Sequence, residues 1–80
     1  MNIENNSTQS YSEIDNLLQQ NIEKDIHVKI KEGSTIQGNL KAFDRHLNLC
    51  LSDGIIKKND EITKFKNTLL RGSDILVILL

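Results

Sequence analysis

From residue 25 onward, apolar and polar residues alternate along much of the chain with a period of two. This alternation is typical of β-strands that bury one face, and it begins with the run DIHVKI at 25–30. After a turn at 32–34, where Gly33 can supply a positive φ, a second alternating run extends from 35 to 43. Gly38 interrupts this second run, which predicts a strongly bent strand of the kind that closes a small barrel.

The next alternating run carries Leu47, Leu49 and Leu51 on one face and predicts a third strand. We expect this strand to end at residues 52–54 (SDG), because serine, aspartate and glycine are common turn residues. Residues 55–61 (IIKKNDE) leave two alternatives open, since they can either extend the third strand or form a lysine-bearing loop.

The C-terminal part of the chain predicts two more strands joined by a turn. Residues 62–70 predict a fourth strand, residues 71–74 (RGSD) a turn, and residues 75–80 (ILVILL) a fifth strand that is apolar on both faces. An exposed edge strand normally carries charges or proline, and this one has neither. We therefore expect another copy of the chain to cover it, in a head-to-tail arrangement that closes into a ring.

The N-terminal part follows a different pattern. Residues 1–11 are polar, lack apolar periodicity and predict a disordered tail, so that residues 12–80 form the single domain. A short helix should begin this domain, capped by Ser10 or Ser12 and ended near Asn21. Its apolar stripe, which we expect to pack on the rest of the domain, recurs at helical spacing and consists of Ile14, Leu17, Leu18 and Ile22.

Composition limits how such a domain can be stabilised. A chain of 80 residues with 38% hydrophobic content cannot bury a large core, so extra stabilisation is expected. Cys50 is the only cysteine and no metal-ligand spacing is present, which leaves oligomerisation as the favoured source. We interpret Cys50 as an ordinary buried thiol in a reducing compartment.

The charge is nearly balanced but unevenly distributed. The net charge of −1 argues against a polycation that grips nucleic acid by bulk electrostatics. Residues 1–21 carry three acids and no base, so residues 22–80 have eight acids and ten bases and are mildly basic. No apolar run approaches the roughly 18 residues of a membrane span, and we expect a cytoplasmic protein without membrane partners, or a nuclear one if the source is eukaryotic.

The candidate chemistry lies in the polar turn between the second and third strands. Asp44, His46 and Asn48 occur there between the apolar anchors Phe43 and Leu49, and they are expected to face the turn that contains Arg71 and Gly72. Neither turn supplies an activated nucleophile, a metal cluster, an acid–base carboxylate pair or a phosphate loop. An enzyme is therefore the weakest hypothesis, and no cofactor or metal is expected.

Two segments together resemble the motifs of the Sm and Sm-like (Lsm) family, and the resemblance covers residues 13–80. The second motif is similar to residues 69–78 (LLRGSDILVI). The first motif, a glycine turn, a bent strand and a D-x-H-x-N signature, is matched by Gly33, Gly38, Leu40, Phe43, Asp44, His46, Leu47, Asn48, Leu49 and Asp53. The order of the two motifs behind a short helix makes the signal specific.

This resemblance implies a mostly β fold, in which a short N-terminal helix precedes a five-stranded, strongly bent antiparallel β-barrel. It also implies a ring, with a heptamer favoured over a hexamer, formed by pairing of the fourth and fifth strands of neighbouring copies. Such rings bind single-stranded, uridine-rich RNA at the inner rim and support RNA processing or ribonucleoprotein assembly. The RNA-binding residues implied here are His46, Asn48, Arg71 and Gly72, with Asp44, Ser73 and Asp74 as possible RNA-binding or pocket-ordering residues.

The residue types suit this chemistry. The flat side chains of His46 and Arg71 can sandwich a base, while the Asn48 amide can read the uracil edge. Asp44 is expected to order the turn by accepting hydrogen bonds from backbone N–H groups. Archaeal relatives often carry aspartate where this chain has Ser73, which leaves a structural ring with weak or no sequence-specific RNA binding as the alternative.

Overall fold

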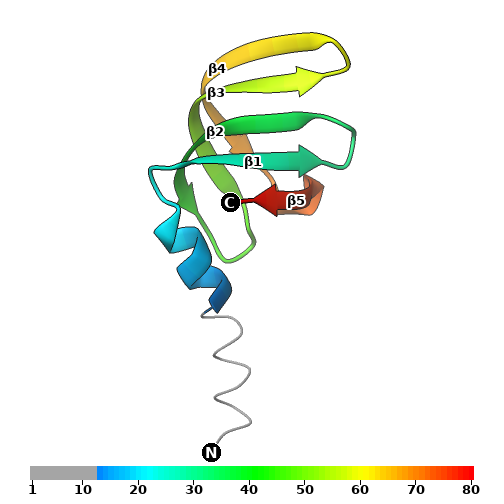
Figure 1. The fold of residues 1–80 in the computed structure, drawn as a ribbon. Coiled ribbons are helices and arrows are strands. Elements are labelled where there is room, and N and C mark those ends of the chain that lie inside the picture. The colour runs from blue at the N-terminus through cyan, green and yellow to red at the C-terminus, as the bar shows by residue number, and fades with distance from the viewer. Residues whose placement is uncertain (1–12) are drawn as a thin grey trace, which may run out of the picture.

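The computed structural model describes residues 13–80, and it contains a short helix followed by five antiparallel strands (Figure 1). The expected fold class is confirmed, whereas the tail expected at 1–11 lies outside the described residues. Residues 13–20 are helical, and the remaining elements are β1 (Asp25–Ile30), β2 (Thr35–Phe43), β3 (Leu49–Lys58), β4 (Glu61–Leu70), a 3₁₀ turn (Gly72–Asp74) and β5 (Ile75–Leu79).

All five strands belong to one sheet in the order β4-β3-β2-β1-β5. The sheet is strongly bent, and β4 and β5 are its two edges (Figure 1). Two register shifts between β2 and β3 mark the bend, and Gly54 of β3 lies close to the backbone of Gln37 and Gly38 in β2. A Cβ added to Gly54 would lie 1.9 Å from the carbonyl oxygen of Gln37, so the close approach needs glycine. Gly38, which the sequence singled out, lies against the Phe65 ring at the same close approach.

The third strand is longer than predicted and begins later. Leu47 is not part of it, because it has a φ of 61° in the preceding turn, and β3 starts at Leu49. The expected end at 52–54 is wrong: Asp53 adopts a φ of 52°, and pairing with β4 continues on both sides of it. Of the two alternatives for residues 55–61, extension is correct as far as Lys58, and a tight turn with Asn59 at φ 56° leads into β4.

The core lies inside the bend of the sheet and is small. Its members are buried to at least 92% and are all aliphatic: Leu18, Ile26, Val28, Ile36, Leu40, Leu49, Leu51 and Leu70. Within the expected helical stripe, Leu18 is buried in the core and Ile22 packs against it, whereas Ile14 and Leu17 are each 53% exposed. The expectation that the stripe packs on the domain is therefore confirmed for two of its four residues and wrong for the other two. The helix does end as predicted, where the Asn21 side chain donates to the carbonyl of Leu17 over 2.8 Å.

Both edge strands expose apolar side chains. On β4 the exposed residues are Ile62 and Leu69, and on β5 and just beyond they are Leu76, Val77, Leu79 and Leu80. Leu69 alone is 80% exposed. Unpaired edges with apolar side chains are templates for pairing with another chain, so both edges of this sheet are suited to association.

Candidate functional site

The two turns singled out in the sequence meet in the structure. β3 and β4 are paired from Leu49 opposite Leu70, so the turn that enters β3 and the turn that leaves β4 lie at the same end of this hairpin. The backbone N–H of Gly72 donates to Oδ1 of Asn48 over 2.8 Å. A Cβ on Gly72 would lie 1.9 Å from the carbonyl oxygen of His46, so glycine is needed for the turns to touch.

Asp44 organises the first turn. Its Oδ1 accepts hydrogen bonds from the backbone N–H groups of His46 and Asn48, at 2.9 and 3.0 Å. Its Oδ2 accepts a further bond from Nδ2 of Asn48 at 2.9 Å. These contacts, led by the Asn48 side chain, lower the pKa of the Asp44 carboxyl, because they stabilise its charged form. The turn is therefore built around an ionised carboxylate.

The backbone of this turn is tight. The Leu47 N–H donates to the carbonyl of Asp44 over 3.0 Å, and the Asp44 N–H donates to the carbonyl of Asn48 over 3.2 Å. The positive φ of Leu47 allows the chain to reverse here. The side chains of His46 and Asn48 are exposed in this turn, and Arg71, the residue before Gly72, is exposed in the other turn.

Ser73 and Asp74 belong to the 3₁₀ turn that connects Arg71 to β5. The Asp74 N–H donates to the carbonyl of Arg71 over 2.9 Å, and the Asp74 carbonyl accepts from the N–H of Lys31 at the same distance. Both side chains are exposed. The side-chain amide of Asn48 is hydrogen-bonded to Asp44, to which it donates, and to Gly72, from which it accepts.

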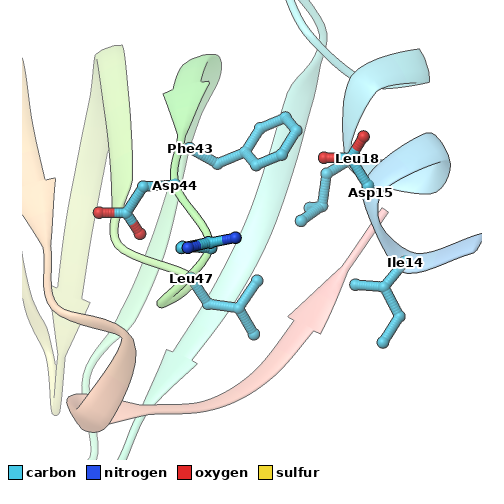
Figure 2. A pocket seen from close by; sticks show the side chains of 7 residues that line it. Ile14, Asp15, Leu18, Phe43, Asp44 and Leu47 are labelled. Atoms are coloured by element: carbon cyan, nitrogen blue, oxygen red, sulfur yellow. The ribbon is translucent and has the colours of Figure 1, made fainter. Parts of the chain in front are cut away.

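The helix lies beside the first turn. A groove separates the two, and Figure 2 shows Phe43 and Leu47 on the turn side facing Leu18 and Ile14 on the helix side. Asp15, Asp44 and Arg45 complete its lining. Since Phe43 and Leu47 pack against the hydrophobic core, both ends of the polar turn are anchored.

The contact between Asn48 and Gly72 was not predicted from the sequence. Both residues were candidates for direct RNA contact, but no local pattern indicates that the amide of one binds the backbone of the other. Among residues 13–80, no group of three or more histidine, cysteine, aspartate or glutamate side chains could hold a metal ion. In the same range, no helix is both long and apolar enough for a membrane span.

Comparison with known proteins adds independent information. A family model described as the LSM domain matches residues 16–80. An Sm-like protein of Aeropyrum pernix is 37% identical over 57 residues, covering 71% of this chain and 74% of the relative. A heptameric archaeal Sm protein of known structure is 33% identical, with a TM-score of 0.74 over 79% of this chain and 93% of that one. The Sm protein of Pyrococcus abyssi, solved in complex with a uridine heptamer, is 28% identical, with a TM-score of 0.75 over 80% and 92% of the respective chains.

Proposed function

The chain belongs to the LSM domain family, and we propose that it is the subunit of a ring that binds single-stranded, uridine-rich RNA at its inner rim. In this proposal the ring supports RNA processing or ribonucleoprotein assembly and performs no catalysis. The observation that carries it is the contact of the two turns through Asn48 and Gly72, because the exposed residues His46 and Arg71 belong to these two turns.

Each part of this site has a role that matches a single-stranded base. His46 and Arg71 offer flat groups for stacking, and a base–aromatic stack contributes about 1–3 kcal/mol. Asn48 supplies hydrogen-bonding atoms for the base edge, and the arginine adds positive charge toward the phosphate. The uridine heptamer bound by the relative from Pyrococcus abyssi supports this ligand class.

The ring is supported by the two uncovered edges of the sheet. β4 and β5 are unpaired on their outer sides within residues 13–80, and both expose large apolar side chains. Pairing β4 of one copy with β5 of the next would satisfy the free backbone groups and bury Leu69 and Leu76. The heptameric archaeal relative supports seven copies as the favoured number, with six as the alternative.

A structural ring with weak or no sequence-specific RNA binding is the competing function. Two observations favour it: the net charge is −1, and the side chain at position 73 is a serine hydroxyl rather than a carboxylate. The two functions predict the same assembly and differ in RNA affinity.

Binding of a fluorescent uridine 7-mer, measured by anisotropy at several salt concentrations, separates them. We expect salt-sensitive binding that falls at least about fivefold in His46→Ala and in Arg71→Ala, because each loses a stacking partner. Arg45→Ala is the matched control, since it removes a positive charge from the same turn on the side that faces the helix groove. If the wild type shows no salt-sensitive binding, or if both site variants bind like Arg45→Ala, RNA binding at this site is refuted.

A further inference from the structure

The groove between the helix and the first turn has room for one more apolar side chain. Its apolar lining comes from Ile14 and Leu18 on the helix side and from Phe43 and Leu47 on the turn side (Figure 2). The groove has a volume of about 120 Å³, and a cavity of roughly 150 Å³ lined by similar side chains binds benzene. Ile14 is half exposed at its edge, so part of this apolar surface is not covered by residues 13–80. An aromatic ring would fit the groove and cover that surface.

The segment that precedes the helix carries an aromatic residue at a matching position. The helix lines the groove with residues 14, 15 and 18, which lie on one helical face because they are one, three and four positions apart. Residue 11 lies three positions before 14 and seven before 18, so a helix lengthened by one turn would place it on the same face. This residue is Tyr11, the one aromatic residue among residues 1–12 of the sequence.

The sequence also contains a start signal for the longer helix. Ser10 and Glu13 have the S-x-x-E spacing of a capping box, in which the serine and the glutamate each bind a backbone N–H group of the other's end of the turn. With Ser10 as the N-cap, Tyr11 would be the first helical residue. A helix of residues 13–20 is short and marginal on its own, so an added turn that docks an aromatic ring would stabilise it.

We propose that this groove is the docking site of the N-terminal segment of the same chain, and that the Tyr11 ring occupies it. The segment is adjacent to the groove, since residue 12 is two positions from Ile14, which lines it. The charged residues of the lining suit a tyrosine, because the Arg45 guanidinium can contact the ring face and the Asp15 carboxylate can accept from the phenol hydroxyl.

Docking would connect the N-terminal segment to the turn that carries His46 and Asn48. Leu47 belongs to this turn and Phe43 directly precedes it, and both line the groove. A ring packed against them would hold the turn from the helix side. The inference goes beyond the proposed function and does not depend on RNA binding.

Tyrosine fluorescence tests the proposal directly, because Tyr11 is the only tyrosine and the chain has no tryptophan. Acrylamide quenching of the assembled protein then measures how exposed the Tyr11 ring is. We expect a quenching constant at least about twofold lower than for the chain unfolded in urea, because the groove shields much of the ring area. Ile14→Ser should raise the constant toward the unfolded value. Leu17→Ser is the matched control, since Leu17 is equally exposed on the same helix and does not line the groove.

A mixed assembly distinguishes docking within one chain from docking on a second copy. When Ile14→Ser and Tyr11→Ser chains are unfolded and reassembled together, every remaining tyrosine belongs to a chain whose own groove is altered, while the Tyr11→Ser copies offer intact grooves. We expect quenching in this mixture to match that of Ile14→Ser alone. Restored protection would show that the ring docks on a second copy and would overturn the proposal.

Three further results would also overturn it. The first is a wild-type quenching constant equal to that of the unfolded chain. The second is protection that persists in Ile14→Ser, which would mean that another surface covers Tyr11. The third is an equal rise in Ile14→Ser and Leu17→Ser, which would assign the change to loss of helix and not to the groove.

Discussion

Replacing Gly72 with alanine tests whether the two turns depend on their direct contact. The added Cβ would lie 1.9 Å from the carbonyl oxygen of His46 and 3.0 Å from the carbonyl carbon of Leu47. Both are backbone atoms, so neither can move aside by a change of rotamer. The turns must separate by more than about 1 Å to restore an ordinary contact, which breaks the hydrogen bond from Gly72 to Asn48.

The cost has two parts. Forcing a methyl group into a packed contact costs typically about 1–3 kcal/mol, and losing one hydrogen bond costs about 0.5–1.5 kcal/mol. We therefore expect Gly72→Ala to lower the free energy of unfolding by about 2–4 kcal/mol. Because Gly72 does not have a positive φ, this cost arises from the contact and not from the backbone conformation of the glycine.

Urea unfolding followed by circular dichroism measures this difference, with all proteins at one subunit concentration because assembly contributes to stability. Ser73→Ala is the control, since it alters an exposed side chain in the same turn. If Gly72→Ala and Ser73→Ala differ by less than about 0.5 kcal/mol, the turns do not support each other and the two-turn site is refuted.

Two further variants test the surroundings of the site. Hydrogen bonds to the Glu32 carboxylate, chiefly from Ser34 and next from Lys58, lower its pKa from 4.5 to about 2. The ionised carboxylate therefore stabilises the folded state above pH 4.5, and this contribution is lost as the pH falls toward 2. The difference in unfolding midpoint between the wild type and Glu32→Gln should vanish across this window, and a constant difference would contradict the pairing. Leu76→Lys places a charge on the exposed face of β5, and native mass spectrometry should detect a smaller assembly with unchanged circular dichroism, whereas an unchanged mass would contradict edge pairing.

The sequence predicted the fold well where one face of a strand is buried throughout. In β1 the alternation of Ile26 and Val28 with polar residues survives intact in the structure, with both side chains fully buried. The third strand was misjudged because Asp53 and Gly54 are turn residues by local criteria. β3 nevertheless stays paired with β4 through this segment, with Ser52 opposite Asn67 and Gly54 opposite Phe65. Pairing with the neighbouring strand therefore overrides the local turn signal.

The site was predictable as a set of residue types but not as a set of contacts. His46, Asn48 and Arg71 follow from the two motifs, and the meeting of their turns follows from adjacent strands. The bond between Asn48 and Gly72 joins residues 24 positions apart, and no periodicity encodes it. The positive φ of Leu47 also has no signal, because leucine rarely adopts that conformation and the surrounding contacts impose it.

The order of the strands couples the site to assembly. The turn that carries Arg71 and Gly72 leaves β4, one edge of the sheet, and leads directly into β5, the other edge. In the proposed ring, the same short segment would therefore join the two surfaces that contact neighbouring copies, and each copy would place its site beside the next. If the proposed function holds, a single site binds one base weakly, and a strand of RNA that spans several sites gains affinity because each later contact is intramolecular. Leu76→Lys should thus weaken binding of the uridine 7-mer far more than binding of a single uridine nucleotide, although it changes no residue of the site.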